Sequence, residues 1–124
     1  MTGEGSKLTT MNPSTIINTA HDQPPVEMLE RFRDRAGHLD RTNTYFHEDL
    51  DELRAFGYLA AAVPVEFGGA GLDLAQMAAS QRRLARFAPA TALAMTMHSY
   101  WVGIAAELER AGDTSLRWIL DAAV

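Results

Sequence analysis

The sequence predicts an all-α domain, with about five helices packed as a small helical bundle. Apolar residues recur at spacings of three and four in several segments, which is the period of one helix face. No stretch sustains the alternation of apolar and polar residues that is typical of a half-buried strand. Glycines and prolines fall between the periodic segments, where they separate one helix from the next.

The first helix is predicted over residues 25–41, because proline is tolerated in the first turn and Pro24–Pro25 stands at its start. Its apolar residues lie three or four positions apart along one stripe; they are Val26, Leu29, Phe32, Ala36 and Leu39. A second, short helix is predicted over residues 47–56, with Gly57 ending it in the left-handed conformation. Pro64 then forces extended geometry on Val63, so a loop is expected from that point.

The loop over residues 64–72 has three glycines in four positions, which is typical of a tight turn. A phosphate site is the alternative function of such a loop, but the strand that should precede it is missing. Asp73 is predicted to cap a helix over residues 74–88, with Leu74 on its apolar face. A long apolar helix follows over residues 91–111.

The last helix is predicted after Gly112, which stands just past the long helix. Asp113 or Thr114 is expected to cap it, and its apolar residues follow at helical spacing; they are Leu116, Ile119 and Leu120. The chain stops at Val124 directly out of this amphipathic segment. Because domains usually end in a polar tail, we expect a longer protein to continue here.

Composition excludes several classes of protein. The 124 residues have the size of one domain, and 47% of them are hydrophobic, enough to bury a core. The absence of cysteine excludes a disulfide framework and a thiol nucleophile, and suits a cytoplasmic protein. The net charge of −5 and the single lysine, Lys7, argue against nucleic acid as a partner. No histidine has metal-ligand spacing to a carboxylate, so no metal site is expected.

Two segments bear on targeting. Residues 1–23 are polar and predict a disordered tail ahead of a domain over residues 24–124, since they lack a signal-peptide core. The run from Ala88 to Ala106 has no Asp, Glu, Lys or Arg, and is almost long enough to span a membrane. Its proline and polar residues favour a buried helix, so no membrane association is expected.

The long helix contains the side chains of most chemical interest. His98 is either a hydrogen-bonded core histidine or a residue that lines a pocket. Four residues around it could form an aromatic and sulfur box for a flat cofactor; they are Met95, Met97, Tyr100 and Trp101. Plain core packing is the favoured interpretation of these four, because such residues are routinely buried. No complete catalytic set is present.

One segment carries a more specific signal. Residues Val63–Asp73 read VPVEFGGAGLD and resemble the "VP.EFGG.GLD" loop of the acyl-CoA dehydrogenase N-terminal domain. The family's preceding helix pair is matched between Leu39 and Gly57, and its following "LAR" by Leu84–Arg86. A segment similar to the family's "GT..Q" stretch lies at Gly112–Leu120, shifted by one residue. The resemblance covers residues 24–124.

The resemblance implies the N-terminal third of a three-domain, FAD-dependent oxidoreductase that dehydrogenates acyl-CoA thioesters. In such enzymes the flavin and the catalytic base belong mainly to the later domains. It follows that no residue of this chain is expected to be catalytic, and that the chain alone is inactive. The family helix matching residues 91–111 walls the acyl pocket, which makes Met95, His98 and Ser99 the predicted substrate-binding residues. A homo-oligomer is implied for the full-length protein.

Two alternatives remain at this point. Reduced-flavin monooxygenases share the fold and place polar or histidine side chains in this region, so His98 favours that function. A free-standing helical interaction module is the other alternative, in which the face from Leu93 to Leu108 would meet a partner helix.

Overall fold

The computed structural model describes residues 23–124 and contains helices but no strand in that range. The predicted disordered tail lies outside the described residues, except for its last residue. The helices are α3 (Val26–Thr42), α4 (His47–Phe56), α5 (Leu74–Phe87), α6 (Pro89–Arg110) and α7 (Arg117–Ala122), with two 3₁₀ turns, η1 (Tyr58–Ala60) and η2 (Val65–Phe67). The predicted all-α class with five helices is confirmed.

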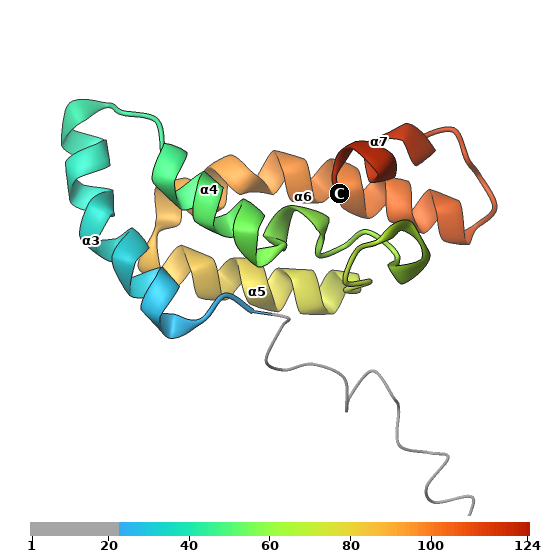
Figure 1. The fold of residues 1–124 in the computed structure, drawn as a ribbon, viewed down its shortest axis with the longest axis horizontal. Coiled ribbons are helices and arrows are strands. Elements are labelled where there is room, and N and C mark those ends of the chain that lie inside the picture. The colour runs from blue at the N-terminus through green and yellow to red at the C-terminus, as the bar shows by residue number, and fades with distance from the viewer. Residues whose placement is uncertain (1–22) are drawn as a thin grey trace, which may run out of the picture.

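The arrangement is built around the long helix α6. Helices α5 and α6 run side by side, and α3 crosses one end of α5 (Figure 1). Helix α7 folds back onto the far end of α6, so the C-terminus returns to the middle of the molecule (Figure 1). Helix α4 packs against η1, which in turn contacts α6. Helix α6 therefore contacts α5, α7 and η1.

Most predicted helix ends are confirmed. Asp73 caps α5 through its side chain, which accepts from the Gln76 amide at 2.8 Å, and the Gln76 side chain accepts from the Asp73 amide. Gly57 has a φ of +92° at the end of α4, and Gly112 has a φ of +88° after α6. These local signals therefore act in the folded chain as the sequence indicates.

Two predicted boundaries are wrong. Helix α6 begins at Pro89, two residues before the expected start, because proline is favoured in the first helical turn. The last helix begins only at Arg117 and has no side-chain cap. Asp113 instead accepts a hydrogen bond from the Ser115 amide at 2.9 Å, which closes a turn ahead of the helix.

A buried carboxylate joins three helices. Asp49 of α4 has no exposed surface. Its Oδ1 accepts from Arg35 Nε of α3 at 2.8 Å, and its Oδ2 accepts from Thr91 Oγ1 of α6 at 2.7 Å. Arg35 also pairs with Glu52 at 2.8 Å. Because a buried charge is costly unless it is paired and hydrogen-bonded, this cluster ties the first turn of α6 to α4 and α3.

The core lies between these helices. Its fully buried side chains come from four of the five helices and from the loop that follows α4; they are Leu29, Phe32, Leu53, Val63, Leu84 and Leu120. Leu74, which the sequence placed on the buried face of α5, is 82% exposed. It occupies the first position of the helix, beyond the reach of the core. Within residues 23–124, no helix has the length and hydropathy needed to cross a membrane.

Candidate functional site

The long helix α6 presents three different surfaces. Met95 points into the core and is 3% exposed. Ser99 and His98 lie on two other faces, and each lines a separate apolar cavity. The three residues predicted to bind substrate are thus not brought together. Their binding role stays a prediction, and the geometry separates Met95 from both cavities.

A chain of hydrogen bonds holds the middle of α6 in place. The Tyr58 hydroxyl of η1 donates to the Gln81 side chain of α5. The Gln81 amide in turn donates to the Ala92 carbonyl and to Thr96 Oγ1, both in α6. Burial raises the pKa of Tyr58 to about 12, since the phenolate would lose its solvation. This network joins α6 to α5 and to η1.

The first cavity lies between the start of α5 and the second half of α6, and we call it the α5–α6 cavity. Its volume is about 730 Å³. Apolar groups dominate its lining, among them Leu72, Leu74, Met77, Tyr100, Gly103 and Ile104. Three charged residues also contribute to it; they are Asp73, Glu107 and Arg110. The cavity therefore suits an apolar group.

Ser99 lines the α5–α6 cavity, but its hydroxyl oxygen is shielded from that space. Its Oγ is buried and has no hydrogen-bond partner among the described residues. A buried hydroxyl without a partner loses about 1–3 kcal/mol of solvation. A ligand in the cavity could reach this oxygen only if neighbouring groups moved, so a contact between Ser99 and a substrate stays a prediction.

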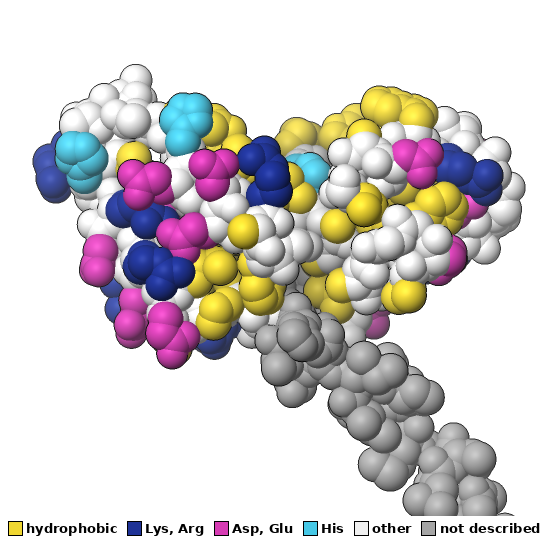
Figure 2. All heavy atoms as spheres, viewed as in Figure 1, with side chains coloured by type: hydrophobic (Ala, Val, Ile, Leu, Met, Phe, Trp, Pro, Cys, Tyr) yellow, Lys and Arg dark blue, Asp and Glu magenta, His cyan; other side chains and the backbone are white. Residues whose placement is uncertain are grey.

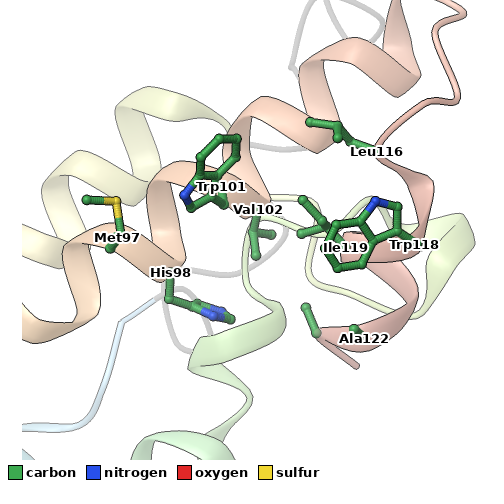
Figure 3. Close-up of a pocket in the computed structure, with 9 residues that line it drawn as sticks. Met97, His98, Trp101, Val102, Leu116, Trp118, Ile119 and Ala122 are labelled. Carbon is green, nitrogen blue, oxygen red and sulfur yellow. The ribbon is translucent and has the colours of Figure 1, made fainter.

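The second cavity lies between α6 and α7, and we call it the α6–α7 cavity. Its volume is about 600 Å³. Figure 3 shows Trp101 and His98 extending from α6, with Trp118 and Ile119 across from them on α7. Among the described residues, no Asp, Glu, Lys or Arg lines this cavity. The sequence did not indicate Trp118 as a site residue, because it lies off the apolar stripe of α7.

His98 combines the two interpretations left open by the sequence. It is half-buried, and its Nε2 lies 2.7 Å from the Leu59 carbonyl oxygen. That bond joins α6 to the segment just before the glycine loop. The ring also lines the α6–α7 cavity, so His98 has both a structural contact and access to a cavity.

The prediction of plain core packing is wrong for three residues of the aromatic and sulfur group. Met97 is 63% exposed, Tyr100 56% and Trp101 47%, and only Met95 is buried. Leu93, at 75%, extends the same exposed stripe. Figure 2 shows charged side chains gathered at the α3–α4 end and apolar ones toward the α7 end. An apolar surface of this kind indicates a binding or packing face.

The described residues do not fit the pyrophosphate of a dinucleotide. The helix that follows the glycine loop is α5, and its N-terminus is already occupied by the Asp73 carboxylate. A second anion there would be repelled. The prediction of a structural turn is thereby favoured over a phosphate site. Residues 23–124 also contain no group of His, Asp and Glu side chains placed to hold a metal ion.

The fold and its site define an all-helical domain whose central helix borders two apolar cavities. Comparison with known families adds that residues 27–117 match the model described as "Acyl-CoA dehydrogenase, N-terminal domain". The chain belongs to the acyl-CoA dehydrogenase family, of which these residues form the N-terminal domain.

A relative in Bacillus subtilis (strain 168), with the name "Putative acyl-CoA dehydrogenase YdbM", is 32% identical over 76 residues. The match spans 61% of this chain and 20% of the relative, so the chain corresponds to a small part of that protein. No solved structure gives a significant match.

Proposed function

We propose that this chain is the N-terminal part of a flavin-dependent acyl-CoA dehydrogenase-like oxidoreductase, with α6 as one wall of the acyl pocket. The main support for this proposal is the α5–α6 cavity, an apolar space of about 730 Å³ in a chain that belongs to this family. Ligand pockets typically have volumes of about 300–1,000 Å³ and are mostly apolar. Tyr100, which lines this cavity, and Leu93 are exposed on α6 and extend its apolar surface.

The role of this chain is to shape the pocket and exclude water. Dehydrogenation removes a proton from the α-carbon of the thioester and a hydride from the β-carbon, and a double bond forms between them. FAD, held by other parts of the enzyme, would supply the acceptor for the hydride. An apolar helix wall keeps water from the reacting centre. We therefore propose that the chain is inactive alone, and that it functions within a cytoplasmic homo-oligomer.

The test uses the complete polypeptide that contains this chain. We expect a yellow flavoprotein whose flavin absorbance is bleached by an acyl-CoA thioester. Gly103→Leu adds bulk to the α5–α6 cavity and should raise KM for long acyl chains more than for short ones. Ala85→Leu is the matched control, because Ala85 is exposed on α5 outside the cavity. Absence of bleaching by every acyl-CoA tried would reject the dehydrogenase proposal.

A reduced-flavin monooxygenase is the second candidate, and the imidazole of His98 at the α6–α7 cavity favours it. Oxygen consumption with reduced flavin, without binding of any CoA thioester, would support this alternative. The helical interaction module is favoured by the exposure of Leu93 and Met97 on α6. A complete polypeptide that binds no flavin would support the module instead.

A further inference from the structure

The α6–α7 cavity shares no lining residue with the α5–α6 cavity, and an acyl wall at the α5–α6 cavity does not explain it. We propose that this cavity binds a planar aromatic ligand carrying one hydrogen-bond donor, an O–H or N–H, and that His98 Nδ1 accepts this bond. The proposal does not depend on the dehydrogenase function, because it concerns separate residues and another kind of ligand.

The hydrogen-bond partner of His98 decides the tautomer. A carbonyl oxygen only accepts hydrogen bonds, so the contact of 2.7 Å with Leu59 requires the proton on Nε2. In the neutral ring Nδ1 then carries a lone pair and is an acceptor. The backbone of η1 thus orients the ring and fixes which edge can receive a donor.

The remaining nitrogen is open to a ligand. His98 Nδ1 makes no hydrogen bond with residues 23–124, and it is not among their buried polar atoms that lack a partner. Leu59 is not part of the cavity lining, whereas His98 is. The Nε2 edge of the ring faces η1, and we assign the accessible Nδ1 to the side of the cavity that His98 lines.

The lining selects an uncharged aromatic ligand. Trp101 is 47% exposed and Trp118 is 66% exposed, and Figure 3 shows them on the two helices that border the cavity. Aromatic rings gain from stacked or edge-to-face contacts beyond the area they bury. No charged side chain of residues 23–124 lines the space, so an anionic group would find no ion-pair partner there.

The acceptor at Nδ1 also discriminates between ligands. A thioester offers only a carbonyl acceptor, which would face the lone pair of Nδ1 without forming a bond. A phenol O–H or an indole N–H offers a donor that can form a hydrogen bond with His98 Nδ1. Specificity built on a buried hydrogen bond is stronger than that built on shape alone, because the analogue without the donor leaves the site unpaired.

The experiment is calorimetric titration of the complete polypeptide with indole and with 1-methylindole, which lacks the N–H. We expect indole to bind roughly tenfold more tightly, as one net hydrogen bond of about 1 kcal/mol or slightly more allows. His98→Phe keeps an aromatic ring of similar size and removes both ring nitrogens, including the acceptor at Nδ1. In this variant the two ligands should bind equally, and a melting curve checks that the domain remains folded.

Trp118→Ala gives an independent test, since Trp118 lies on the surface and its truncation leaves the core intact. We expect this variant to lose binding of indole. Ala85→Leu, away from the cavity, should bind as the unaltered protein does. The proposal is overturned if neither ligand binds, if both bind equally to the unaltered protein, or if Trp118→Ala binds indole normally.

Discussion

Replacing Gly69 by alanine should be among the most damaging single changes in this chain. A Cβ at that position would lie 2.2 Å from the Val63 carbonyl oxygen and 2.5 Å from the Ala60 carbonyl oxygen. Both contacts are with backbone, so no side chain can rotate away to make room. The glycine loop must move by about 1 Å to restore ordinary contact distances near 3.5 Å.

That movement breaks the bonds that fold the loop onto η1. The Gly71 amide donates to the Val63 carbonyl at 2.8 Å, and the Ala70 amide donates to the Ala60 carbonyl at 3.2 Å. The Leu72 amide donates to the Ala61 carbonyl at 2.8 Å. Each bond contributes about 1 kcal/mol to the free energy of unfolding. Losing two or three of them, together with the overlap that the loop movement does not remove, costs about 2–4 kcal/mol.

Thermal unfolding followed by circular dichroism is the assay. A loss of this size lowers Tm by roughly 10–30 °C in a domain of about 100 residues. Gly103→Ala is the matched control, because a Cβ at Gly103 meets nothing within 4 Å and the residue is inside α6. Alanine should there stabilise by about 0.8–1 kcal/mol. The reasoning is refuted if Gly69→Ala unfolds within about 0.5 kcal/mol of the unaltered protein.

Three further changes test the buried groups. Thr91→Val removes the hydrogen bond to buried Asp49 at nearly constant volume, so the free energy of unfolding in urea should fall by about 1.5–3 kcal/mol. Thr114→Val is the control and should be neutral, because the Thr114 side chain is exposed and makes no such bond. The hydrogen bond from Arg31 lowers the pKa of Glu52 below 4.5, so the stabilisation that the Glu52 carboxylate provides is lost as pH falls below 4.5. Glu52→Gln should therefore make stability depend less on pH in the acid range. Burial raises the pKa of Tyr58 from 10.0 to about 12, so stability should fall as pH rises through this interval, and Tyr58→Phe should remove the late phenolate signal in an absorbance titration.

The helix ends were predictable because the signals that set them are local. Asp73 and its partner three residues later form a capping box whatever lies around them. Gly57 ends α4 because only the left-handed conformation closes the turn. The start of α7 was mispredicted because Asp113 can cap a turn as well as a helix, and the choice depends on how α7 packs against α6.

The candidate site was predicted only in part. Ser99 and His98 each line a cavity, but the cavities are separate, and Met95 lines neither. Helical spacing gives the angle of each side chain around α6, yet it says nothing about which neighbour covers that angle. Trp118 lines the α6–α7 cavity and Leu72 lines the α5–α6 cavity. Both lie outside α6, so no local pattern in that helix could assign them.

The sequence by itself determined that five helices form, most of their ends and the tight glycine loop, because each depends on residues within a few positions of one another. The tertiary structure alone decided which faces of α6 are buried. That helix is apolar almost all round, so it has no polar side to mark the surface. Only the placement of α5 and α7 shows that Met95 enters the core while Met97 and Trp101 remain exposed.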